Sequence, residues 1–224
     1  MEREPTETAT AAVVCIVRLW LPDLPGTLGR LATRIGDVGG DVLGIDILER
    51  GGGRAVDELT VALPAIELVD TLVLELSQLQ GVAVEDVRVV ASEPPDAGTL
   101  ALGVAARLAE ARPEHREELL CSELLTAFGA EWAALVDDAS CQLVHSLGPC
   151  PDLTWLMAFL AGSRHLDPLL FETTAPSDIA WSGVGGASTV VIGRHGAPFH
   201  SRERTQLHLV GRIAAALTVP SPVG

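Results

Sequence analysis

The amino-acid sequence predicts an α+β protein built from two domains, each containing a sheet and helices. The chain has 224 residues, which is long for one small domain and comfortable for two. The segment SEPPDAG, residues 92–98, holds two prolines and a glycine, so it can neither continue a strand nor begin a regular helix. Apolar residues alternate in some stretches and recur at helical spacing in others. We therefore predict a disordered N-terminus over 1–11, a first domain over 12–91, a linker over 92–98 and a second domain over 99–220.

The first predicted element is a central strand. Residues 13–21 are β-branched and apolar, with Arg18 as the only charge. A helix follows, and the pair Gly39-Gly40 ends it as a left-handed C-cap would. Its apolar face is formed by Leu28, Leu31, Ile35 and Val38.

Two further strands, a second helix and a last strand are predicted in the rest of the first half. Apolar residues alternate over 42–48, the turn GGGR follows, and Leu59, Val61 and Leu63 alternate in the next strand. Pro64 is predicted to open a second helix, and residues 82–90 form a last strand. The order βαββαβ is the ferredoxin-like plan, with four antiparallel strands and two helices on one face. The other face is then left bare, and a second subunit or the C-terminal half would have to cover it.

These residues resemble an ACT domain over about 12–90. The resemblance rests on Asp23-Leu24-Pro25-Gly26 after the first strand, on Gly39-Gly40, and on Asp41 at the start of the second strand. It implies a small-molecule regulatory module in which this loop, usually with the second strand of a neighbouring subunit, cradles an amino acid. The predicted ligand-binding residues are Asp23, Leu24, Pro25, Gly26, Thr27, Leu28, Asp41 and Val42.

A physical argument supports this loop independently. Gly26 has no Cβ, so a ligand can approach the backbone, and Pro25 presets φ for the first helical turn. The N–H groups of Gly26, Thr27 and Leu28 would face an α-carboxylate, aided by the helix dipole. Asp23 and Asp41 would offer the opposite charge to an α-ammonium group. The alternative is that Asp23 merely caps the helix and Asp41 lies in solvent.

In the second half, the sequence predicts two helices, over about 100–112 and 114–128, followed by strands in EWAALVDD and CQLVHSLG. A third helix, a strand in STVVIGR and a terminal helix follow, and Ser201 is the candidate N-cap of the terminal helix. The closing strand, turn and capped helix resemble the end of a GAF domain, and the resemblance covers about 100–218. It implies a GAF-like α+β domain with a central antiparallel sheet flanked by helices. If this half holds a ligand, Trp155, Phe159 and Trp181 predict a small and largely apolar one.

Composition argues against several function classes. A formal charge of −15 with scattered arginines argues against nucleic acid and acidic membranes as partners. Lysine and tyrosine are absent, so neither a Schiff base nor a tyrosine nucleophile is available. No CxxC spacing supports a metal site, and buried free thiols are expected at Cys15, Cys121, Cys141 and Cys150. The chain shows no signal sequence and no apolar stretch of ~20 residues, so we expect a cytoplasmic protein.

The sequence therefore predicts a non-catalytic regulatory protein without a cofactor, a metal site or catalytic residues. It would bind an amino acid in its first half, form a homodimer through that half, and act on an unidentified protein partner. In a second interpretation the first half is only a dimerisation module of an interaction protein. An enzyme that uses a cavity of the second half is the third.

Overall fold

The computed structural model describes residues 12–91, 97–163 and 177–218. The predicted disordered N-terminus and most of the predicted linker lie outside these ranges. The chain divides into two compact units, residues 1–96 and 97–224. Within the described ranges, no helix combines the length and apolar character that crossing a membrane requires.

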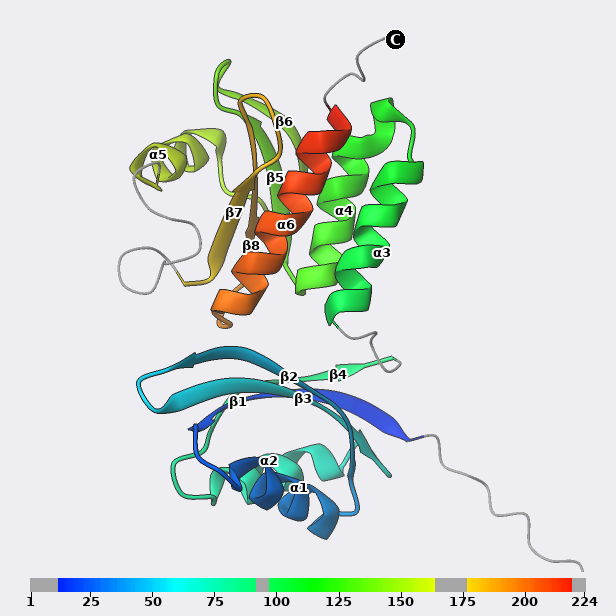
Figure 1. Cartoon of the computed structure of the whole chain (residues 1–224), viewed down its shortest axis with the longest axis vertical. Coiled ribbons are helices and arrows are strands. Elements are labelled where there is room, and N and C mark those ends of the chain that lie inside the picture. The colour runs from blue at the N-terminus through cyan, green and yellow to red at the C-terminus, as the bar shows by residue number, and fades with distance from the viewer. Residues whose placement is uncertain (1–11, 92–96, 164–176, 219–224) are drawn as a thin grey trace, which may run out of the picture. The chain divides into compact units, whose positions relative to one another are not determined.

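The first unit has the predicted ferredoxin-like order. Its antiparallel sheet has the strand order β2-β3-β1-β4, so β1 and β3 are central and β2 and β4 are edges. The two helices cover one face of this sheet (Figure 1). The elements are β1 (Val13–Pro22), α1 (Thr27–Asp37), β2 (Asp41–Gly51), β3 (Arg54–Leu63), α2 (Leu68–Ser77) and β4 (Ala83–Val90).

The core of the first unit lies between the sheet and the helices. Val17 and Leu19 of β1 pack there against Leu31 and Ile35 of α1, all fully buried. α1 ends as predicted, with Gly39 at φ +78°. α2 begins at Leu68 and not at Pro64, because residues 64–67 form a turn whose N–H···O bonds span three residues.

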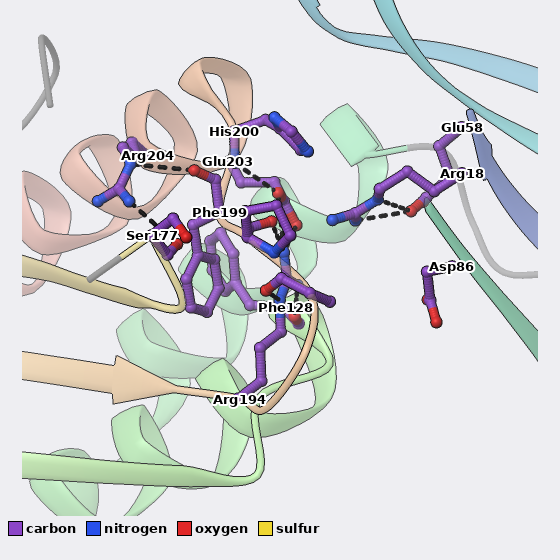
Figure 2. A network of polar contacts seen from close by, with 12 residues as sticks. Arg18, Glu58, Asp86, Phe128, Ser177, Arg194, Phe199, His200, Glu203 and Arg204 are labelled. Atoms are coloured by element: carbon purple, nitrogen blue, oxygen red, sulfur yellow. Dashed lines mark hydrogen bonds and ion pairs between the residues drawn. The ribbon is translucent and has the colours of Figure 1, made fainter. Parts of the chain in front are cut away.

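The face of the first sheet that points away from the helices carries a charge network. Arg18 is only 2% exposed, and its Nε and Nη2 donate to Oε2 of Glu58 at 3.1 and 2.8 Å (Figure 2). Arg88 Nη2 donates to the same oxygen at 3.2 Å, and Trp20 Nε1 donates to Glu85 Oε1 at 2.8 Å. Polar side chains therefore line the face that the two helices of this unit leave uncovered.

The second unit is also α+β. Its four-stranded antiparallel sheet has the order β6-β5-β8-β7, with α3, α4 and α6 against one face and α5 against the other (Figure 1). The elements are α3 (Ala97–Glu110), a 3-10 turn (Pro113–His115), α4 (Arg116–Phe128), β5 (Trp132–Asp137), β6 (Gln142–Leu147), α5 (Leu153–Ser163), β7 (Ile179–Gly183), β8 (Ser188–Gly193) and α6 (Ser201–Thr218).

Two sequence predictions for the second unit need correction. β7 was not predicted, because its five residues, IAWSG, include three small ones and show no clear alternation. Ser201 is the first residue of α6 and not its N-cap. The residue before it is His200, whose backbone N–H donates to Oε2 of Glu203 at 2.9 Å, as in one half of a capping box.

The cysteines of the whole chain and the aromatic residues of the second unit are placed as follows. All four cysteines of the chain are free; Cys15 and Cys121 are buried, Cys150 is half-buried and Cys141 is exposed in a turn at φ +53°. The expectation of four buried thiols is therefore confirmed for Cys15 and Cys121, is wrong for Cys141, and is met only in part by Cys150. Burial raises the pKa of the Cys121 thiol to about 12. Trp155, Phe159 and Trp181 pack on one another in the layer between α5 and the sheet.

Candidate functional site

The predicted binding loop lies at the end of the sheet where the β2–β3 hairpin turns. The N–H of Asp23 donates to the carbonyl oxygen of Gly53 in that hairpin at 3.0 Å. Inside the loop, the Leu24 N–H donates to Pro22 O at 2.9 Å and the Thr27 N–H donates to Leu24 O at 3.2 Å. Backbone hydrogen bonds within the loop and to the β2–β3 hairpin therefore fix its conformation.

The start of α1 is open. Its N-cap is Gly26 at φ +84°, and no side chain makes a capping hydrogen bond there. The alternative that Asp23 caps the helix is therefore wrong. The N–H of Thr27 is engaged by Leu24, so it is not available to a ligand as predicted. The N–H groups of Gly26 and Leu28 donate to no acceptor within the described residues.

Gly26 also leaves its surroundings clear. A Cβ built on this residue would meet no atom within 4 Å, so the backbone faces open space. The glycine is required by its left-handed conformation, which costs other residues roughly 1–2 kcal/mol. A small ligand can thus reach the first N–H groups of α1, at the positive end of the helix dipole.

Asp57 is a buried carboxylate beside this loop. It lies on β3 opposite Leu19 of β1. Ala55 and Leu59, two residues away on either side, belong to the core under the helices, so strand alternation directs Asp57 to the same face. The residue is 2% exposed, and its Oδ1 has no hydrogen-bond partner. A buried carboxylate oxygen without a hydrogen-bond partner is costly and rare, so a function for it is expected.

Two charged side chains lie near Asp57. Arg50 of β2 places its Nε 4.0 Å from Oδ1 of Asp23, and both side chains are about half exposed, at 57% and 43%. Burial raises the pKa of the Asp57 carboxyl; the Arg50 guanidinium opposes this shift, and the Asp23 carboxylate adds to it. The end of the sheet therefore places the carboxylates of Asp23 and Asp57 near the guanidinium of Arg50.

Asp41 and Val42 lie at the other end of the sheet. Asp41 begins β2 and pairs with Ala62, whereas the loop lies beside Arg54, at the start of β3. From residue 54 to residue 62 the strand rises about 26 Å at ~3.3 Å per residue. A pocket formed by Asp23 and Asp41 of the same chain is therefore excluded by the strand register.

Sequence reasoning missed Arg50 and Asp57. A signal was present for Asp57, because it interrupts the apolar alternation of Ala55, Leu59 and Val61 with a charge at a core-facing position. The nearness of Arg50 to Asp23 depends on the hairpin and could not be found from spacing.

A second group of buried charges lies at the start of α6 (Figure 2). Arg194 donates to the carbonyl oxygens of Phe128 and Pro198 at 2.6 and 2.7 Å and to Glu203 Oε1 at 2.8 Å. Arg204 donates to the carbonyl oxygens of Phe199 and Ile179 at 3.1 and 3.0 Å. These bonds tie α6 to the strands and to α4, so we assign this group to the fold and not to a ligand site.

Comparisons with known proteins found similar solved structures but no matching family. No protein-family model matches the sequence, and no curated protein matches it. The ACT domain of GTP pyrophosphokinase from Chlorobium tepidum is similar over 35% of this chain and 99% of that chain, with 18% identity and a TM-score of 0.29. The ligand-free regulatory subunit of aspartate kinase from Thermus thermophilus is similar over 54% of this chain and 99% of that chain, with 17% identity and a TM-score of 0.31.

A third similar structure reaches across both units. It is provisionally described as a glycine cleavage system transcriptional repressor, and it covers 82% of this chain and 79% of that chain, with 8% identity and a TM-score of 0.32. These comparisons do not support the GAF-like assignment of residues 99–220. That expectation is corrected to a coarser statement: the second unit is a four-stranded antiparallel sheet with helices on both faces.

Because every one of these TM-scores is below 0.5, the fold of the first unit rests on its strand order and register. Residues 13–90 form a ferredoxin-like βαββαβ unit.

Proposed function

We propose that the protein is a non-catalytic regulatory protein that binds a free amino acid at the β1–α1 loop. The observation that carries the proposal is the unpaired buried carboxylate of Asp57 beside the exposed carboxylate of Asp23. An α-ammonium group between them would donate the hydrogen bond that Oδ1 of Asp57 lacks and would add a positive charge to that of Arg50. The surface pair of Arg50 and Asp23 is worth at most about 1 kcal/mol, so a ligand can displace it at little cost.

The opposite end of the ligand has partners as well. An α-carboxylate would accept hydrogen bonds from the free N–H groups of Gly26 and Leu28 at the start of α1. The guanidinium of Arg50, released from Asp23, would add a positive charge beside it. The site thus offers separate partners to the two charges of a zwitterion, which supports an amino acid over a simple anion or cation.

We further propose that two copies complete the site. β2 is an edge strand, and antiparallel pairing of two β2 strands about a twofold axis brings the first residues of one beside the last residues of the other. Asp41 and Val42 of the partner subunit would then lie near Arg50 and the loop. In this arrangement the loop with Asp23 and the residues Asp41 and Val42 of the partner subunit would form one site. Within a single chain the strand register keeps them apart.

A thermal-shift screen of the twenty amino acids on the full chain tests the proposal. Ligand at a hundredfold excess over Kd stabilises by about 2.7 kcal/mol, which raises the melting temperature of a small domain by several degrees. Asp23→Asn, Asp57→Asn and Asp41→Asn should each remove the shift. Asp70→Asn, at an exposed position in α2, is the matched control and should keep it.

Mixing two inactive variants separates the shared site from a site within one chain. A mixed dimer of Asp23→Asn and Asp41→Asn chains has one intact site and one doubly altered site. Random exchange of equal amounts makes about half of the dimers mixed, so about a quarter of the wild-type binding capacity should return. If no amino acid stabilises the wild type, the first unit is a dimerisation module. If the shift appears but mixing restores nothing, the amino-acid site lies within one chain.

A further inference from the structure

The second unit contains a cavity that the proposed function does not use. Its volume is about 360 Å³, far more than a single water molecule requires. It lies between the sheet and the helices α3, α4 and α6. Buried apolar side chains from four elements and from the turn after β7 form its floor, namely Leu108, Leu120, Leu135, Val184 and Ala214.

The position of the cavity differs from the sequence expectation. Of the aromatic residues that suggested an apolar ligand, Trp181 and Phe159 pack in the layer under α5, and the exposed Trp155 stacks on Phe159, with ring centroids 5.2–5.4 Å apart. The cavity lies on the opposite face of the sheet, among aliphatic side chains. A concave apolar space of this size with a few polar groups at its mouth has the typical character of a small-molecule site.

The rim of the cavity carries one positive and one negative side chain. Arg116 is fixed there: its Nε donates to the carbonyl oxygens of Leu108 and Ala111 at 3.2 Å each, and its Nη1 donates to Leu217 O at 2.7 Å. These oxygens lie at the C-terminal ends of α3 and α6, so Arg116 satisfies groups that the helices leave unpaired. Glu117 is the exposed neighbour on the same rim.

The electrostatics of this rim select against charged ligands. The formal charges of Arg116 and Glu117 cancel, and the C-terminal ends of two helices add partial negative charge. The whole chain carries −15, so no long-range field attracts an anion. A cation would have to leave water for a floor that contains only aliphatic side chains, which is costly.

We propose that this cavity binds a small, uncharged, largely apolar molecule, at a site separate from the amino-acid site. The apolar body of the ligand would lie on the floor of the cavity. A polar end, such as a hydroxyl or an amide, would remain at the rim beside Ser188 and Arg116.

Two dyes that differ by one sulfonate group test the proposal on the full chain. N-phenyl-1-naphthylamine is neutral, and 1-anilinonaphthalene-8-sulfonate is its anionic counterpart; both fluoresce in apolar surroundings. The neutral dye should bind saturably, one per chain, at least tenfold more tightly than the sulfonate. Glu117→Gln leaves the Arg116 charge uncompensated, so it should strengthen sulfonate binding several-fold and leave neutral-dye binding unchanged.

Variants at the floor and rim locate the dye. Ala214→Phe fills the floor and Leu217→Trp narrows the rim, so each should weaken neutral-dye binding at least tenfold. Thermal melts identify any variant that does not fold. Leu209→Gln is the control: it removes apolar surface from the exposed groove between α3 and α6, and binding should not change.

The proposal is overturned if the folded floor and rim variants bind the dye as the wild type does, or if Leu209→Gln removes binding. Tighter binding of the sulfonate than of the neutral dye by the wild type would overturn the assignment of an uncharged ligand.

Discussion

Asp57 places a carboxyl group where its neighbours on the same face of β3 are apolar. Burial without a hydrogen bond to Oδ1 penalises the charged form, and this raises the pKa of the group above that of an exposed aspartate. A residue that lowers the stability of the ligand-free protein and lies at the candidate site is typical of a binding position. Such a residue is kept for its function although it lowers the free energy of unfolding.

The raised pKa of Asp57 predicts a pH dependence of stability. Between the ordinary pKa of about 3.9 and the raised value, the folded chain holds a proton that the unfolded chain has released. The free energy of unfolding therefore falls as pH rises through this window. Asp57→Asn cannot ionise, so at pH 7 it should melt at a higher temperature than the wild type, by about 4–8 °C if the gain is about 1 kcal/mol.

Melting curves of the first unit's transition from pH 3.5 to 8, without ligand, measure this difference. It should disappear at the acid end, where Asp57 is protonated in both states. An Asp57→Asn protein that is less stable than the wild type at every pH would show that the carboxylate has a structural partner, and the unpaired-charge account would fail.

At the scale of elements, the start of α6 depends on one ion pair. Arg194 and Glu203 are both buried, with Nη2 and Oε1 2.8 Å apart, and Glu203 also accepts the N–H of His200. The pair connects the end of β8 to the first turn of the helix. Since sequence spacing showed only a turn and a charged helical start, the role of this pair emerges from the packed structure.

We expect Glu203→Gln to destabilise the second unit by about 3–5 kcal/mol, because it leaves the Arg194 guanidinium buried without its counter-charge. Glu118→Gln, in the first turn of α4 and exposed, should change stability by less than about 0.5 kcal/mol. Urea titrations of both variants and the wild type measure the difference. Equal urea midpoints for the two variants would show that the Arg194–Glu203 pair does not stabilise the packing of α6.

At the scale of the whole molecule, the edge strand β2 is the proposed surface between two copies. Register shifts interrupt its pairing with β3 on either side of residues 44–47, which leaves this short regular stretch to pair outward. Ile45, within this stretch, is 45% exposed, and Leu43, at the first register shift, is 37% exposed, although both are large and apolar. A partner strand would cover them.

Ile45→Lys should therefore convert a dimer into a monomer at tens of micromolar, because it places a charge within the apolar contact. Val89→Lys, on the opposite edge strand β4, changes a comparably exposed apolar residue and should leave the dimer intact. Light scattering with size-exclusion chromatography reads the mass directly. A monomeric wild type, or loss of the dimer only with Val89→Lys, would contradict the β2 interface and with it the shared site.

The sequence by itself determined most elements of both units and the position of the β1–α1 loop. The reason is local: the period of the apolar residues sets strand or helix, and residues such as Gly26 and Gly39 meet backbone requirements within a few positions of themselves. Where that local signal is weak, as in the five residues of β7, the prediction failed.

Only the tertiary structure decided which residues share a site. Strand order and register bring Asp23, Arg50 and Asp57 together from three elements, and the same register separates Asp23 from Asp41. In the second unit, the packing of four elements and one turn forms the floor of the cavity beside Arg116. These are contacts between residues distant in the chain, and the apolar period of a single segment contains no information about its neighbours in space.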